Sequence, residues 1–140
     1  MKIKKKVIYE PNDSEKFMNA KQVEYFKNLL LTWRKDILQE SSNTLDNLKE
    51  ESSNKPDNAD RASIESERSL ELRTRDRERK LLNKIDKALR KIDDGTYGFC
   101  EETNKPISLA RLKARPIATL SIEAQEMHER FEKIYKEKEY

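Results

Sequence analysis

Apolar residues recur every three or four positions along the first third of the chain. The stripe consists of Val23, Phe26, Leu30, Trp33 and Ile37. This spacing places apolar side chains on one face of a helix and is typical of a helix that packs along a single partner. The stripe weakens at residues 40–43 and resumes at Leu45 and Leu48. The pattern predicts a helix from Asn19 to Ser53, about 50 Å long.

A second stripe follows a polar segment. Its members are Ile64, Leu72, Leu81, Ile85, Leu89 and Ile92. The intervening run "SSNKPDNADRAS" is rich in turn-forming residues, and Asp60 is placed to act as the N-cap of the second helix. Gly95 in "DDGTYG" is expected to end that helix. Two helices of similar length joined by a short link favour an antiparallel coiled-coil hairpin over residues 19–94, with its tip at residues 54–60.

The remaining segments have a different texture. Residues 95–120 carry glycines, prolines and scattered aromatics without a long period, which indicates a compact irregular or short-stranded unit. A C-terminal amphipathic helix is expected within residues 121–140, over about Ser121 to Lys138. Its apolar residues are Ile122, Met127, Phe131 and Ile134. Residues 1–18, with a short helix near Asp13 to Met18, are expected to pack on the irregular unit. The predicted fold class is therefore mainly α.

Composition supports elongated helices over a compact globule, because 41% of the residues are charged and 34% are hydrophobic. The net charge of +3 excludes strong polyanion binding by the molecule as a whole. The longest apolar cluster, Leu29 to Trp33, is far shorter than the roughly 20 residues of a membrane span. No apolar run follows the basic start as a signal peptide would require. The single cysteine excludes an internal disulfide. These features predict a cytoplasmic protein with no membrane partner.

Four motifs carry a family resemblance: "DNADRA", "LRTRDRERKLL", "YGFC" and "RLKARP". Together they resemble the DksA/TraR family over most of the chain. The resemblance implies a bacterial transcription regulator, not an enzyme, that binds RNA polymerase directly instead of specific DNA sequences. It implies that the hairpin enters the secondary channel of the polymerase and changes promoter-complex stability together with the alarmone ppGpp. In that family this belongs to the stringent response, at ribosomal-RNA and amino-acid promoters.

The tip carries Asp57, Asp60 and Ala62, which match the family pattern Asp-x-x-Asp-x-Ala. The residues alone are explained by turn formation at Asp57 and helix capping at Asp60, the cap contributing about 1 kcal/mol. The resemblance implies in addition that these three residues contact the polymerase near its active centre.

The run "RTRDRERK", Arg73 to Lys80, interleaves acids with bases. Alone it indicates a solvated helix face with weak ion pairs, in which Asp76 and Glu78 serve as partners. Because acids alternate with bases and aromatics are absent, it is a poor nucleic-acid patch. The resemblance implies that Arg77 binds RNA polymerase.

Lys84 and Arg115 align with family positions that face ppGpp. Lysine and arginine suit phosphates because they supply charge and several donors. The third basic position of that set is Gln125 here, and the lost charge is expected to weaken alarmone binding.

Many family members hold zinc with four cysteines, but the corresponding residues here are Cys100, Thr103, Ser121 and Ala124. Structural zinc needs four sulfur or nitrogen ligands, and His128 cannot complete the set by itself. Cys100 is therefore expected to be a small buried remnant of the family zinc site, in a zinc-finger-like unit without zinc. That unit must be held by packing of Tyr97, Phe99, Ile107, Leu109, Leu112, Ile117 and Leu120.

Two other functions remain open. A factor similar to the Gre transcript-cleavage factors would use acidic tip residues to help hold a catalytic metal ion. A simple coiled-coil scaffold would dimerise along the apolar stripes. The stripes are interrupted at residues 40–43 and 65–68, which disfavours a strong homodimer and predicts a monomer.

Overall fold

The computed structural model describes the backbone of residues 9–52 and 58–138, and the side chains of residues 9–43 and 61–138. The helices are α1 (Ala20–Ser52), α2 (Asn58–Asp94), α3 (Leu109–Ala114) and α4 (Ile122–Lys138). Within the described residues there is no strand, only an isolated bridge between Phe99 and Pro106. The predicted mainly α fold is confirmed. None of the helices in the described part of the chain is both long and apolar enough to cross a membrane.

The chain divides into two compact units. Unit 2 comprises Leu30–Lys87, which includes α1 from Leu30 onward and α2 up to Lys87. These two helical segments are called its arms, and the ends at Leu30 and Lys87 are called its base. Unit 1 comprises Met1–Leu29 together with Ala88–Tyr140. The four-part division expected from the sequence stays a prediction.

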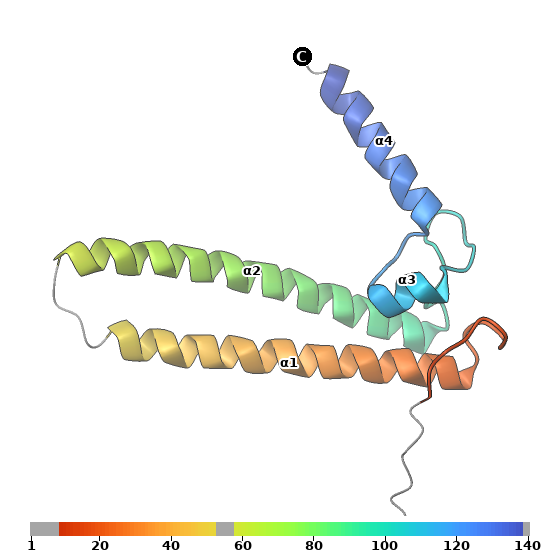
Figure 1. Cartoon of the computed structure of the whole chain (residues 1–140), viewed down its shortest axis with the longest axis horizontal. Helices are drawn as coiled ribbons and strands as arrows, with labels where there is room; N and C mark the ends of the chain where they lie inside the picture. Colours follow the sequence, from red (N-terminus) through yellow and green to blue (C-terminus); the bar gives the residue numbers. More distant parts are fainter. Residues whose placement is uncertain (1–8, 53–57, 139–140) are drawn as a thin grey trace, which may run out of the picture. The chain divides into compact units, whose positions relative to one another are not determined.

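The arms of unit 2 pair in antiparallel register. Arg34 Nε of α1 donates to Asp86 Oδ1 of α2 at 2.9 Å. Seven residues further along α1, the Ser41 hydroxyl donates to the carboxylate of Glu78. The partner on α2 thus moves back as the position on α1 advances, which is the geometry of two helices running in opposite directions (Figure 1). The expected antiparallel hairpin is confirmed.

The apolar stripes predict part of the contact between the arms. Leu30, Ile37 and Ile85 are buried in unit 2, whereas the predicted stripe member Leu72 is 64% exposed. The prediction for Leu72 was wrong because it lies 13 residues before Ile85. At roughly 100° per residue that separation turns its side chain about 140° away from Ile85.

The end of α2 is set by Gly95. Its φ of 76° is in the left-handed region, which is readily available to glycine. The Gly95 N–H donates to Ile92 O at 3.2 Å, and the Thr96 N–H donates to Lys91 O at 2.9 Å. These two bonds form the Schellman motif that closes a helix C-terminus. The role predicted for Gly95 is confirmed.

The start of α1 is held by its own side chains. Asn19 Oδ1 accepts from the Gln22 N–H at 2.9 Å, as an N-cap does, and Gln22 Oε1 accepts from the Met18 N–H at 2.8 Å. Gln22 is fully buried by this arrangement. The short helix expected near residues 13–18 was wrong, since these residues form turns. Met18 has a φ of 52°, and the Asn12 side chain accepts from the Ser14 N–H, both of which favour turns over a helix.

The core of unit 1 forms around Tyr97. Its ring lies 5.6 Å from that of Phe26, which is fully buried at the base of α1. The Tyr97 hydroxyl donates to Pro116 O at 2.7 Å. Burial raises the pKa of this phenol well above its usual range. Of the packing residues expected from the sequence, the buried ones are Tyr97, Ile107, Leu109, Leu112 and Ile117.

Two expected core residues lie nearer the surface. Phe99 is 36% exposed and Leu120 is half-buried. Phe99 packs edge-on against Phe17, with ring centroids 5.4 Å apart, so one side of its ring faces solvent. The six-residue helix α3 was not predicted; the Ser108 hydroxyl caps it by accepting from the Arg111 N–H at 3.3 Å.

Helix α4 begins one residue later than expected. The Ser121 hydroxyl accepts from the Ala124 N–H at 3.3 Å and caps the helix. Among its described residues only Ala124 is buried. Its large apolar side chains are 48–70% exposed; they are Ile122, Met127, Phe131, Ile134 and Tyr135.

Candidate functional site

The predicted tip residues fall at the start of α2. Asp57 lies outside the described residues. Asp60 is the third residue of α2, so its expected role as N-cap is wrong: the helix begins two residues earlier, at Asn58. The Asp60 side chain is not described, whereas Ala62 is exposed. An acidic residue in the first turn still favours the helix N-terminus through its charge. The polymerase contact expected of all three residues stays a prediction.

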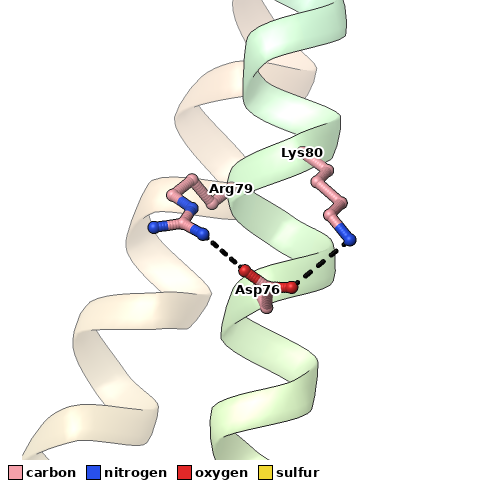
Figure 2. Close-up of polar contacts among 3 residues, drawn as sticks. All are labelled: Asp76, Arg79 and Lys80. Carbon is pink, nitrogen blue, oxygen red and sulfur yellow. Dashed lines mark hydrogen bonds and ion pairs between the residues drawn. The ribbon is translucent and has the colours of Figure 1, made fainter.

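Arg77 lies on α2 beside an ion-pair cluster that does not include it. Asp76 Oδ1 is 2.6 Å from Arg79 Nη2, and Asp76 Oδ2 is 3.4 Å from Lys80 Nζ (Figure 2). The hydrogen bond from Lys80, together with the charges of Lys80 and Arg79, lowers the pKa of Asp76. Arg77 is exposed and makes no ion pair with any described residue. Its guanidinium is therefore available to an outside partner.

The acids predicted as partners in this run divide their roles. Asp76 binds the neighbouring bases, as expected. Glu78 instead accepts from the Ser41 hydroxyl of the other arm. Asp76 thus pairs with Arg79 and Lys80, and Glu78 bonds to the other arm. Neither carboxylate pairs with Arg77.

An exposed basic stripe connects Arg77 with Lys84. Arg73, Arg77, Lys80 and Lys84 are all exposed and are separated by four, three and four residues along α2. This spacing places them on one face of the helix. The helical spacing of Arg73, Arg77 and Lys80 is evident from the sequence, but the sequence prediction did not connect Lys84 with them. The structure therefore brings Arg77 and Lys84 onto one continuous basic face.

Arg115 lies in the other unit, directly after α3. Its side chain is exposed, and its backbone N–H donates to Arg111 O at 2.7 Å. The Arg111 side chain has a structural contact, because its Nε donates to Leu120 O at 3.0 Å. Lys84 belongs to unit 2 and Arg115 to unit 1, so the phosphate site predicted from both stays a prediction. Gln125, at the third position, is half-buried and donates to Glu129 Oε1 at 3.4 Å.

The four positions that correspond to zinc ligands form a hydrogen-bonded cluster. Cys100, Ser121 and Ala124 are buried. Burial alone would raise the pKa of the Cys100 thiol. However, hydrogen bonds from the Thr103 hydroxyl and from the backbone N–H groups of Ser121, Thr103 and Glu102 outweigh burial and lower this pKa to about 6. The predicted burial of Cys100 is confirmed.

These residues do not fit a zinc ion. One thiol, two hydroxyls and a methyl group stand where zinc needs four sulfur or nitrogen donors. The Ser121 hydroxyl accepts from the Ala124 N–H, and the Thr103 hydroxyl oxygen accepts from the Lys105 N–H at 3.4 Å. Within the described part of the chain, no group of three His, Cys, Asp or Glu residues could hold a metal. His128 is exposed, and its Nε2 forms a hydrogen bond with the carboxylate of Glu102.

Two sequence families match the chain. Residues 22–92 match the family described as DnaK suppressor protein DksA, N-terminal domain. Residues 95–130 match the prokaryotic dksA/traR C4-type zinc finger. The second match includes the cluster around Cys100, which keeps one of the four cysteines that the description implies.

Curated relatives and a solved structure agree with these matches. The chain is 58% identical to the RNA polymerase-binding transcription factor DksA of Caulobacter vibrioides, over 92% of this chain and 91% of the relative. It is 42% identical to the protein of the same name from Escherichia coli, over 89% and 83%. The structure of transcription factor DksA2 from Pseudomonas aeruginosa matches with a TM-score of 0.79 and 40% identity, over 89% of this chain and 94% of that one. On these matches and on its fold, the chain belongs to the DksA family.

Proposed function

We propose that this protein binds RNA polymerase directly and regulates transcription in the cytoplasm. The observation that carries the proposal is the 58% identity, over nine-tenths of both chains, to a relative named for polymerase binding. Arg77, which is exposed and pairs with none of the described residues, and the basic stripe around it supply a surface for such a partner. Exposed arginine, with its planar set of donors, suits recognition of carboxylates on another protein.

The test compares two arginines two residues apart on α2. Arg77→Ala should weaken binding to purified core RNA polymerase by about tenfold, because an exposed arginine anchor is lost. Arg79→Ala is the matched control: Arg79 is paired with Asp76 within its own helix, and the loss should be less than about threefold. Equal losses for the two variants, or no binding by the wild-type protein, would contradict the proposal.

The second part of the proposal concerns the hairpin tip. Asp57 and Asp60 act on the polymerase near its active centre, and the protein itself carries out no catalysis. The double variant Asp57→Asn/Asp60→Asn should retain polymerase affinity and lose regulation of a ribosomal-RNA promoter in vitro. Regulation that survives both substitutions would refute the role of the tip. Cleavage of backtracked RNA by stalled elongation complexes, dependent on the protein, would instead indicate a Gre-like activity.

The third part concerns ppGpp. Lys84 and Arg115 would supply positive charge to its phosphates when the protein is bound to polymerase as a monomer, without sequence-specific DNA contacts. The neutral Gln125 leaves the site with less charge than the family pattern has. Lys84→Ala and Arg115→Ala should each reduce the effect of ppGpp on transcription while basal regulation continues. The exposed Lys113→Ala in α3 is the control and should leave the ppGpp effect unchanged.

A further inference from the structure

The contact between the arms of unit 2 changes character along its length. Near the base, Leu30 and Ile37 of α1 and Ile85 of α2 are buried. Beyond them, the described side chains of residues 38–43 and 61–84 include no fully buried apolar one. One cross-arm contact here is the hydrogen bond from the Ser41 hydroxyl to Glu78. Among the described side chains of unit 2, apolar burial, the main driving force for pairing, is therefore concentrated around Leu30, Ile37 and Ile85.

Two charged side chains lie further from the base, one helical turn apart on α2. Glu71 Oε2 and Arg75 Nη2 are buried, and neither atom has a hydrogen-bond partner among the described residues. The register set by Arg34–Asp86 and Ser41–Glu78 places the backbone of residues 44–49 opposite them. Each atom has lost water without gaining a replacement, which disfavours the closed arrangement of the arms.

We propose that the layer formed by Glu71 and Arg75 divides unit 2 into two parts of different local stability. Residues 30–37 and 81–87 remain paired, whereas residues 38–52 and 58–80 separate, lose their helical hydrogen bonds and re-form as one local opening unit, because a helix without a packing partner is marginally stable in water. The physical basis is that opening releases two uncompensated buried polar atoms to water, and that none of the described apolar side chains of residues 38–43 and 61–80 is fully buried. Asp60, Ala62 and Arg77 are carried by the part that opens. This inference goes beyond the proposed function and does not depend on polymerase binding.

Amide hydrogen exchange of the full-length protein tests the proposal. In the wild type, the backbone amides of residues 61–80 should share one low protection, with a step to high protection at residues 81–87. In Glu71→Leu/Arg75→Leu, exchange of residues 61–80 should slow by about tenfold or more, because apolar side chains replace the unpaired groups. Residues 30–37 and 81–87 should change by less than about twofold, and they report that the variant remains folded.

The matched control is Arg61→Leu/Glu65→Leu, a pair of opposite charges at the same spacing on the same helix. Both residues are exposed, so exchange should change by less than about twofold. Equal slowing in the two double variants would overturn the proposal, since it would reflect helix propensity alone. A wild type without a step, or loss of protection throughout Glu71→Leu/Arg75→Leu, would also overturn it. Exchange is measured at two protein concentrations, and slowing that appears only at the higher one would assign the effect to self-association.

Discussion

Arg34 and Asp86 are joined across the two arms by a hydrogen bond of 2.9 Å, although 52 residues separate them in the sequence. The bond fixes which residues of α1 and α2 lie opposite each other. Their side chains are 40% and 38% exposed, so water and salt screen the attraction.

A double-mutant cycle should therefore find a small coupling. Arg34→Ala, Asp86→Ala and the double variant are expected to give a coupling free energy of about 0.5–1 kcal/mol. Urea unfolding in low salt measures it, and the coupling should fall in 1 M salt because ions screen exposed charges. A coupling of several kcal/mol that persists in high salt would contradict this assignment.

Gly98 is expected to be the more sensitive of the two glycines. It has a φ of 88°, and a Cβ there would lie 3.0 Å from Met18 Cε and 3.1 Å from Phe17 Cζ. Gly98→Ala should lower the free energy of unfolding by about 2–3 kcal/mol through backbone strain and crowding. Gly95→Ala is the control: it has a comparable φ of 76° but no heavy atom within 4 Å of its Cβ, so its cost should be about 1 kcal/mol. Thermal unfolding of both variants measures the difference, and equal losses would show that crowding is absent.

Cys100 should make stability depend on pH. Burial opposes ionisation of the thiol, but the hydrogen bonds from Thr103 and the backbone prevail and lower its pKa from 9.0 to about 6 in the folded protein. A group with a depressed pKa contributes stability that is complete above its unfolded pKa and is lost as pH falls through the folded pKa. The melting temperature of the wild type relative to Cys100→Ala should therefore decline from pH 9 to pH 6. Parallel curves for the two proteins would contradict the lowered pKa.

Chelators should leave the protein unaffected. The cluster around Cys100 is held by hydrogen bonds and packing, and its donors do not suit zinc. Addition of EDTA is expected to shift the melting temperature by less than about 1 °C, whereas loss of a structural zinc ion would remove several kcal/mol. Metal analysis of the purified protein is the companion measurement. Stoichiometric zinc together with a large EDTA effect would refute this prediction.

Local signals in the sequence were sufficient for the helices and for the end of α2. The spacing of Phe26, Leu30 and Ile37, which are four and seven residues apart, identified the buried face of α1 because these separations return to the same side of a helix. Gly95 ended α2 where expected because a left-handed residue closes a helix by local bonds alone. The asparagine and glutamine of "NAKQ" cap α1 in the same local way, and this signal was available but not used.

The sequence by itself thus determined the helical class, the antiparallel pairing and the family, since these depend on periodicity and on motifs read along the chain. Only the tertiary structure decided that Leu72 faces solvent while atoms of Glu71 and Arg75 are buried. It also decided that Asp76 forms ion pairs with Arg79 and Lys80 but not with Arg77. Only it showed the Cys100 sulfur held by groups from two separate segments, residues 102–103 and Ser121. The physical reason is that burial and charge pairing depend on how the helices turn and on which neighbours approach, and periodicity alone does not specify either.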